Sequence, residues 1–300
     1  MLKRTLFFES PGYINLSDRQ LCFSPRLPHG EQSPPKRIPI EDIGVIVIES
    51  AQIILTSAVM QALAANNTVV VFCDEKHLPA SIFTAMNGHS TMQRTVQAQL
   101  NSTEALKARL WKQTVKAKVI NQAQVLLRNK RSNSGVLHKL AAKVKNGDPE
   151  NIEATAARYY FSSISSDRDF VRDPEGFMPN AALNYGYAII RAAMARALVG
   201  SGLLCIAGIH HHNQYNAYCL ADDIMEPYRA FVDEEIFGCP ESLPDDITTD
   251  LKRKLLNVLT ADVLIKGMKR PLMNAMSYTT ASLARCFLKE QQEIDYPEFC

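Results

Sequence analysis

The chain has 300 residues, of which 46% are hydrophobic and 21% charged, with a formal net charge of +2. Length and apolar content together predict a folded protein with one large or two modest domains, and exclude a disordered polyelectrolyte. No apolar run approaches the roughly 20 residues of a membrane helix, and the start MLKRTLFFES lacks the apolar core of a secretory signal. We therefore expect a cytoplasmic protein without a membrane partner.

The N-terminal quarter of the chain is predicted to be mostly strand. Short β-branched and aromatic segments alternate there with Pro-Gly, Ser-Asp and Asp-rich turns. The expected strands are Thr5–Glu9, Tyr13–Leu16, Gln20–Phe23, Ile38–Ile40, Val45–Glu49, Ile53–Leu55 and Thr68–Cys73. One helix is expected from Thr56 or Ser57 to about Ala65, and residues 24–39, with five prolines, are expected to form a hairpin loop.

After residue 100 the pattern changes to long helices, and no further alternating strand is expected. Residues 77–100 are interpreted as a connector, because His77, Pro79 and Asn87-Gly88 interrupt any long regular element. One helix start is specific: Asp148 is predicted as the N-cap and Pro149 as the first helical residue. The predicted fold class is α+β, with a β-rich domain over 1–76, a connector over 77–100 and an all-α domain over 101–300.

Two stretches of opposite charge lie in the helical part. Residues 101–148 contain eleven Lys or Arg against two acidic residues, a net charge of +9, whereas residues 219–250 contain ten acidic residues against Arg229, a net charge of −9. Such blocks suit a polyanion held beside an acidic, cation-binding pocket. They also suit solvated helix faces joined by salt bridges, and composition alone favours this second interpretation.

The stretch Gly208–Arg229, GIHHHNQYNAYCLADDIMEPYR, concentrates metal-ligand chemistry. Asp222 and Asp223 precede Glu226 by four and three residues, so the three carboxylates can share one helix face. Their mutual repulsion calls for a cation, and oxygen ligands with one imidazole suit Mg²⁺ or Mn²⁺. Seven scattered cysteines without a CxxC pair argue against thiolate zinc and against a disulfide framework. A polar histidine loop without metal remains the alternative.

Glu153 and the basic residues of the first long helix are further candidates. Glu153 lies near a helix start and is followed by small residues, although a single Glu is most often a solvated surface group. Arg109, Lys112 and Lys116 gather on a face next to the predicted apolar stripe, where they could follow phosphates.

Four stretches together resemble the CRISPR-associated integrase that captures new spacers during adaptation, most closely its type II branch. They are residues 110–123, 151–161 and 180–191 and the Gly208–Arg229 stretch, while IPIEDIGVIVIES and CDEKHLP resemble that family's N-terminal domain. The resemblance spans nearly the whole chain. It implies a β-rich N-terminal domain that dimerises and a helical catalytic, DNA-binding domain.

The resemblance also implies a metal site. Its three residues correspond to Glu153, His211 and Glu226, with Asp223 a weaker candidate and His211 either a ligand or a proton-transfer group. The implied cofactor is Mg²⁺ or Mn²⁺. Arg109, Lys112, Lys116 and Lys118 would then hold DNA through phosphate contacts.

The implied function is a metal-dependent DNA integrase and endonuclease. The 3′-hydroxyl of a captured fragment attacks a phosphodiester at the edge of a CRISPR repeat, so the partners are double-stranded protospacer and repeat DNA. The family works as homodimers, two of which are bridged by a small ferredoxin-like companion. Two alternatives stay open: a standalone structure-selective nuclease, and a non-catalytic DNA-binding scaffold whose acidic cluster is structural.

Overall fold

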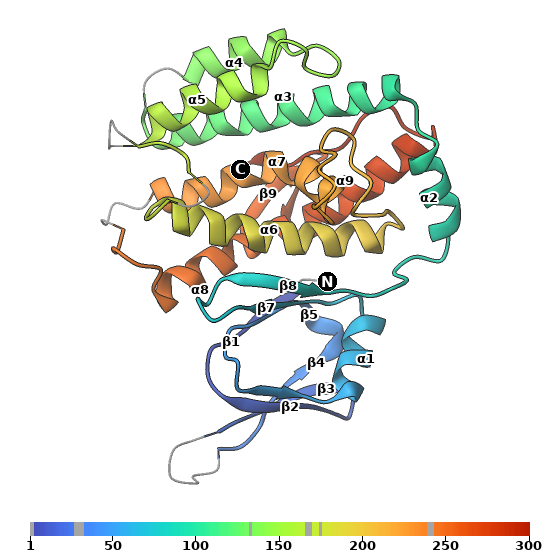
Figure 1. Ribbon diagram of the computed structural model, residues 1–300, viewed down its shortest axis with the longest axis vertical. Helices are drawn as coiled ribbons and strands as arrows, with labels where there is room; N and C mark the ends of the chain where they lie inside the picture. The colour runs from blue at the N-terminus through green and yellow to red at the C-terminus, as the bar shows by residue number, and fades with distance from the viewer. Residues whose placement is uncertain (1–2, 27–32, 132–133, 166–169, 174–175, 239–242) are drawn as a thin grey trace. The chain divides into compact units, whose positions relative to one another are not determined.

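The computed structural model describes residues 3–26, 33–131, 134–165, 170–173, 176–238 and 243–300. The chain divides into two compact units, Met1–Ser90 and Thr91–Cys300, which we call unit 1 and unit 2. Unit 1 is rich in strands and unit 2 in helices, and the α+β class is confirmed (Figure 1).

Unit 1 contains two four-stranded sheets, ordered β1-β5-β7-β8 and β4-β3-β2-β6. Its elements are β1 (Arg4–Phe8), β2 (Gly12–Ser17), β3 (Gln20–Pro25), β4 (Lys36–Pro39), β5 (Ile43–Ile48), β6 (Ile53–Leu55), α1 (Ser57–Ala65), β7 (Val69–Cys73) and β8 (Pro79–Phe83). The seven strands and the helix expected from the alternating pattern are confirmed, with ends that differ by one or two residues.

The centre of unit 1 is the strand β5, IGVIVI, all six residues of which are buried. Parallel neighbours on both sides, β1 and β7, explain why this strand is continuously apolar rather than alternating. The proline-bearing β4 lies at the edge of its sheet, where a missing N–H costs no ladder hydrogen bond. The first and last residues of the predicted hairpin loop, residues 24–39, belong to β3 and β4. Residues 27–32 lie outside the described part of the chain.

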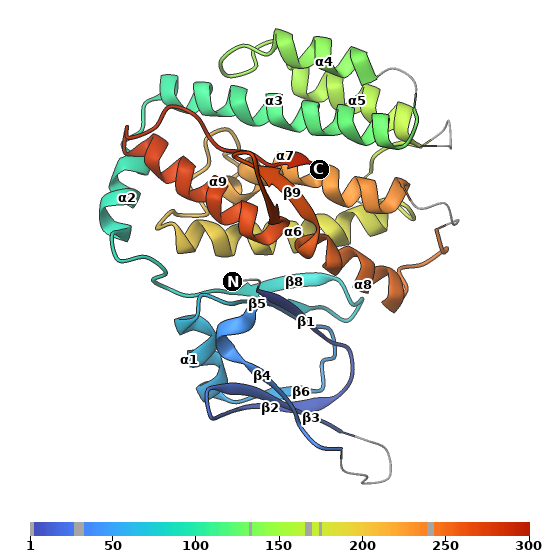
Figure 2. The same cartoon turned by 180° about the vertical axis from the view of Figure 1, so that it is seen from behind.

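Unit 2 is built around the 25-residue helix α3, Glu104–Arg128. Figures 1 and 2 show α3 running between α4 and α5 on one side and α7 on the other, and these helices pack against it. The remaining elements are α2 (Met92–Leu100), α4 (Ser134–Lys143), α5 (Ile152–Ile164), α6 (Asn180–Gly200), α7 (Cys219–Phe237), α8 (Thr249–Asn257), β9 (Asp262–Ile265), β10 (Met268–Pro271), α9 (Leu272–Phe287) and β11 (Glu298–Phe299). This packing brings side chains of α3, α5 and α7 together.

Unit 2 is not purely helical. A small sheet with the order β10-β9-β11 lies in the part of the chain that was expected to be all-α, so that expectation is wrong there. Its strands have four, four and two residues, too short for an alternating pattern to stand out. They are stabilised by pairing with the end of the chain, where Phe299 lies opposite Val263.

Residues 77–100, which were expected to be a connector, contain one strand and one helix. Pro79–Phe83 pairs as β8 with β7 in unit 1, and Met92–Leu100 forms α2 of unit 2, so the boundary at Ser90 falls inside the expected connector. No helix in the described ranges combines the length and apolarity needed to cross a membrane.

Candidate active site

Glu153 lies in the first turn of α5, which begins at Ile152 rather than at the expected Pro149. Asp148 still caps the helix, although from outside it. Its Oδ1 accepts the N–H of Ile152 at 3.0 Å and its Oδ2 accepts the N–H of Glu153 at 2.8 Å. Residue 151 adopts φ +50°, a left-handed conformation that Asn tolerates, and this extra turn of chain delays the helix. The start was therefore predicted three residues too early, but its capping group correctly.

Glu226 lies on α7 and faces α3 and α5. The Nζ of Lys118, from α3, lies 2.6 Å from Glu226 Oε2 and also forms an ion pair with Glu153. The side chain of Lys118 is only 10% exposed and that of Glu226 only 7%. Carboxylates from two different helices therefore converge on one ammonium group. The Nδ2 of Asn121 donates to the carbonyl of Pro227 at 3.0 Å and holds α3 against α7 beside this ion pair.

The charges around Glu226 keep it ionised. Burial by itself raises the pKa of this carboxyl, but Arg229, 3.0 Å away, and Lys118 hold it at about 2. Burial likewise opposes the charge of Lys118, while Glu226 and Glu153 leave its pKa above the ordinary value. Glu226 and Lys118 thus form a buried ion pair in the interior of unit 2.

Asp223, one turn before Glu226, binds residues 208–212, which contain the three histidines and which we call the histidine loop, instead of facing Lys118. Its Oδ2 accepts the N–H groups of Ile209 at 2.6 Å and His210 at 3.0 Å, and its Oδ1 accepts the N–H of His211 at 3.1 Å. A Cβ on Gly208 would lie 2.9 Å from Asp223 Oδ2 and 2.5 Å from the carbonyl of His211. The glycine therefore lets the loop close around the carboxylate.

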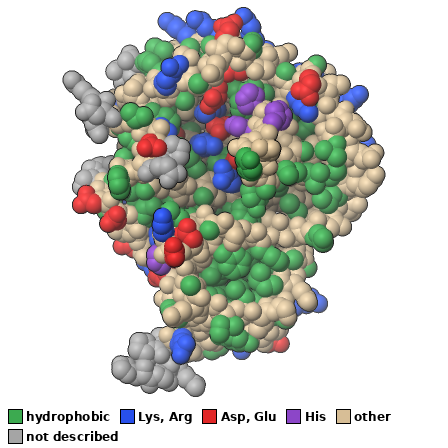
Figure 3. Space-filling model, in the orientation of Figure 1, with side chains coloured by type: hydrophobic (Ala, Val, Ile, Leu, Met, Phe, Trp, Pro, Cys, Tyr) green, Lys and Arg blue, Asp and Glu red, His purple; other side chains and the backbone are tan. Residues whose placement is uncertain are grey.

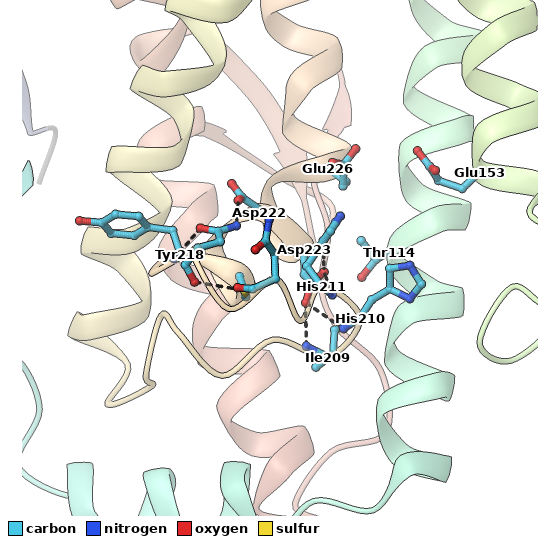
Figure 4. A network of polar contacts seen from close by, with 12 residues as sticks. Thr114, Glu153, Ile209, His210, His211, Tyr218, Asp222, Asp223 and Glu226 are labelled. Atoms are coloured by element: carbon cyan, nitrogen blue, oxygen red, sulfur yellow. Dashed lines mark hydrogen bonds and ion pairs between the residues drawn. The ribbon is translucent and has the colours of Figure 1, made fainter. Parts of the chain in front are cut away.

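His211 is the histidine that this arrangement orients. Its Nδ1 lies 2.5 Å from Asp223 Oδ1, and this hydrogen bond raises the pKa of His211 (Figure 4). In the neutral ring an Nδ1–H donated to the carboxylate leaves the Nε2 lone pair as acceptor or ligand. His210 instead stacks on Trp111 of α3, with ring centroids 4.0 Å apart and planes within 3°. The run of three histidines therefore contains one side chain with a carboxylate partner and one with a packing partner.

The three acidic residues in the first part of α7, Asp222, Asp223 and Glu226, each have their own partners. Asp222 Oδ1 accepts Arg191 Nε at 2.5 Å, and its Oδ2 accepts Asn216 Nδ2 at 2.7 Å. Asp223 binds the loop and Glu226 binds Lys118 and Arg229. Their repulsion is thus relieved by protein cations and N–H groups, rather than by crowding all three around a metal.

A cavity of about 340 Å³ opens beside His211. Lys107, His212 and Asn216 contribute to its lining together with residues 206–208. In Figure 3, histidine side chains on unit 2 gather next to acidic and basic side chains. Gln99 of α2 holds the segment that precedes the three histidines. Its side-chain amide donates hydrogen bonds to the carbonyls of Leu204 and Ala207 and accepts one from the N–H of Leu204.

The donor set fits a divalent cation in kind. Two carboxylates already point at one cation, and His211 offers an oriented imidazole, the ligand types that Mg²⁺ and Mn²⁺ take. Within the described ranges, no three His, Cys, Asp or Glu side chains are arranged as a metal-holding group. Lys118 forms ion pairs with both Glu153 and Glu226, so its ammonium group occupies the position that a metal held by these two carboxylates would take.

The four basic residues expected to bind DNA do not share one environment. Arg109, Lys112 and Lys116 lie within about 60° of one another around α3, whereas Lys118 lies about 180° from Arg109. Arg109 lines a cavity of about 760 Å³ near the start of α3, and Lys116 lines another of about 370 Å³. Lys118 alone is buried, in the ion pairs with Glu153 and Glu226.

Two residues of the site, Asn121 and Gln99, carry no signal of their own in the sequence, because they contact residues distant in the chain. Asp148 and Arg229 instead contact Glu153 and Glu226, which lie within five residues of them. Helical spacing gives a signal for Lys118. Its position on α3, two residues beyond Lys116, turns it to the face that carries Trp111 and away from the basic face.

Comparison with known proteins identifies relatives over nearly the full length. The chain is 32% identical over 307 residues to the CRISPR-associated endonuclease Cas1 of Neisseria meningitidis serogroup C (strain 8013), covering 99% of this chain and 97% of the relative. A casposase bound to integration product matches with a TM-score of 0.78 at 20% identity, over 98% and 93% of the two chains. A chain of a Cas6-RT-Cas1–Cas2 complex matches with a TM-score of 0.68 at 19% identity, over 97% of this chain and 36% of that longer one.

Fold, site and relatives together define an enzyme of the nuclease and integrase class. The family model described as CRISPR associated protein Cas1 matches residues 6–257. The chain belongs to the Cas1 family, and the resemblance found in its sequence motifs is confirmed.

Proposed function

We propose that this protein joins captured DNA fragments to a CRISPR repeat by transesterification at a centre formed by Glu153, His211 and Glu226. One observation carries the proposal: Glu153 from α5 and Glu226 from α7 converge on a single cation, Lys118, in the interior of unit 2. A pair of carboxylates can hold a divalent metal, and an oriented histidine next to it can bind the metal or transfer a proton, as phosphodiester chemistry requires.

In the proposed reaction, a 3′-hydroxyl attacks the phosphorus of a repeat phosphodiester and the bridging 3′ oxygen of the cleaved strand leaves. Mg²⁺ or Mn²⁺ held by Glu153 and Glu226 supplies stabilisation of the negative charge that develops on the phosphate oxygens. His211, oriented by Asp223, serves through Nε2 either as a third ligand or as the group that takes or gives a proton at the reacting oxygens. Glu226 stays ionised across the physiological range because Arg229 and Lys118 hold its pKa near 2.

We propose that Arg109, Lys112 and Lys116 bind the DNA backbone, because they share one face of α3. Lys118 is left out of this set, since it is buried in the ion pairs of the centre. The relative in a Cas6-RT-Cas1–Cas2 complex supports a companion subunit of the Cas2 type. With it we expect homodimers formed through unit 1, working on double-stranded protospacer and repeat DNA in the cytoplasm.

The decisive experiment supplies a labelled fragment with a free 3′-hydroxyl, a supercoiled plasmid carrying a repeat, the companion subunit, and Mg²⁺ or Mn²⁺. Joined products at the repeat edge are expected for the native protein and are lost in Glu153→Gln and Glu226→Gln. Glu298→Gln, a change of an exposed acid in the small C-terminal sheet, serves as the matched control. Cleavage without joining supports the standalone nuclease instead.

The scaffold alternative makes a different prediction. If both carboxylate variants fold, bind DNA and retain full joining, the acidic cluster is structural and the catalytic proposal is wrong. The casposase relative bound to integration product favours joining over cleavage alone as the principal reaction.

A further inference from the structure

Lys118 is the least expected member of the centre. A lysine ammonium is costly to bury, and it is retained here by two carboxylates on opposite sides, Glu153 and Glu226. Its side chain is only 10% exposed, so bulk water has little access to the ammonium group. The ammonium therefore balances the charge of the same two groups that the proposed function assigns to a divalent cation.

The remaining charges leave little room for two cations at once. Glu226 Oε1 lies 3.0 Å from Arg229 and Oε2 lies 2.6 Å from Lys118, so each oxygen of this carboxylate already has a cation at ion-pair distance. A divalent ion placed beside Lys118 would meet one fixed positive charge from α3 and another from α7. Even at the dielectric constant of water, a single and a double charge about 4 Å apart repel strongly enough to change an affinity by more than tenfold.

We infer that Lys118 is a resident counter-ion of the Glu153–Glu226 pair, which competes with the divalent metal and is released when substrate phosphate enters. This inference rests on the proposed function, since it concerns the same two carboxylates. Metal binding requires the ammonium to leave them, and a bound phosphodiester offers oxygen atoms with which it can pair instead. The metal-free enzyme is thereby held in a charge-balanced state of low metal affinity, and DNA raises that affinity by giving Lys118 another partner.

The test measures Mn²⁺ binding to the full chain by calorimetry, with Mn²⁺ electron paramagnetic resonance as a second readout, in the absence of DNA. Lys118→Met, which keeps the length of the side chain and removes its charge, should bind Mn²⁺ at least tenfold more tightly than the native protein. Lys139→Met, at an exposed lysine on α4, should bind as the native protein does. Lys118→Arg, which keeps the charge, should also remain weak. Circular dichroism confirms that each variant is folded.

The second measurement repeats the titrations with a DNA duplex that ends in 3′-dideoxynucleotides, so that no joining takes place. DNA should tighten Mn²⁺ binding at least threefold more in the native protein than in Lys118→Met, because only the native protein has an ammonium to release. Equal tightening in the two proteins overturns the role of phosphate in the release.

Failure of this inference can be told from failure of the proposed function. If Glu153→Gln and Glu226→Gln abolish Mn²⁺ binding while Lys118→Met leaves the affinity unchanged or weaker, the site is correct and the competing role of Lys118 is wrong. If the two carboxylate variants bind Mn²⁺ as the native protein does, the metal centre lies elsewhere and both conclusions fall. Should Lys118→Met not fold, Lys118→Gln takes its place, with the same expected direction.

Discussion

The Nδ1 of His211 and the Oδ1 of Asp223 lie 2.5 Å apart, and the two residues are joined a second time by the backbone N–H of His211, which the same oxygen accepts at 3.1 Å. Asp223 is completely buried, whereas the side chain of His211 is 43% exposed. A buried carboxylate thus holds an imidazole at the edge of a cavity. Asp223 orients the ring, whereas His211 itself is accessible from the cavity.

Replacement of Asp223 by Asn is expected to lower joining activity by about 10- to 100-fold, since His211 loses the acceptor that orients its ring. The free energy of unfolding should fall by about 2 kcal/mol, because a neutral amide oxygen cannot replace both acceptor oxygens for the loop N–H groups. Joining assays and urea denaturation measure the two effects. Asp222→Asn is the matched control, as Asp222 contacts Arg191 and Asn216 rather than the histidine loop, and it should retain most of the activity.

Asp233 is expected to make the stability of unit 2 depend on pH. Burial raises its pKa to about 6, although it accepts hydrogen bonds from Tyr187 at 2.5 Å and Tyr160 at 3.0 Å, and Arg229 and Arg172 act in the opposite direction to burial. The native state therefore binds the proton more tightly than the unfolded chain, whose Asp titrates near 3.9. This contribution to stability is complete below about pH 4 and is lost as the pH rises through 6.

Between pH 5 and 7.5 the loss from Asp233 amounts to about 1 to 2 kcal/mol. Asp233→Asn carries no titrating group, so the difference in unfolding free energy between the native protein and this variant should shrink by that amount over the interval. Urea titrations at several pH values give the difference directly. A difference that stays constant with pH would show that Asp233 has an ordinary pKa.

Gly186 is expected to be required for the packing of α6 on α7. A Cβ at this position would lie 2.4 Å from Val232 Cγ1, and Val232 is fully buried. Gly186→Ala should therefore lower the free energy of unfolding by about 1 to 3 kcal/mol, although helix propensity alone favours Ala by about 1 kcal/mol. Adding Val232→Ala should recover part of the loss, and a double-mutant cycle by urea denaturation measures this coupling. A stabilised single variant would contradict the close contact.

Lys112 and Lys116 are expected to contribute phosphate contacts. The double variant Lys112→Ala/Lys116→Ala should bind duplex DNA more weakly, and the slope of log K against log salt should decrease by about 2, close to one unit for each contact. Fluorescence anisotropy across a salt titration gives the slope. Lys36→Ala/Lys76→Ala, at two exposed lysines of unit 1, removes the same charge and should leave the slope unchanged. Equal slopes in all three proteins would exclude the basic face of α3 from DNA binding.

The amino-acid sequence determined the local structure and the chemical types of the site. Short β-branched and apolar segments were sufficient to predict the strands from β1 to β7, because a half-buried or buried strand is recognisable within five or six residues. Strand β8 was missed, since it lies in the expected connector. The residues of the proposed centre were named through the resemblance of these stretches to the family, since the local pattern alone left Glu153 and the histidines open. The identity of the family followed from the combination of these stretches.

Tertiary structure decided which charges meet. Helical spacing on α3 separates Lys118 from Lys116, but it does not show that Lys118 meets Glu153, 35 residues away. In the same way, helical spacing places Asp222, Asp223 and Glu226 on one face, but they have three different sets of partners in the fold. Periodicity is a property of one segment, whereas burial of an ion pair depends on the packing of several helices, and only that packing made Lys118 part of the site.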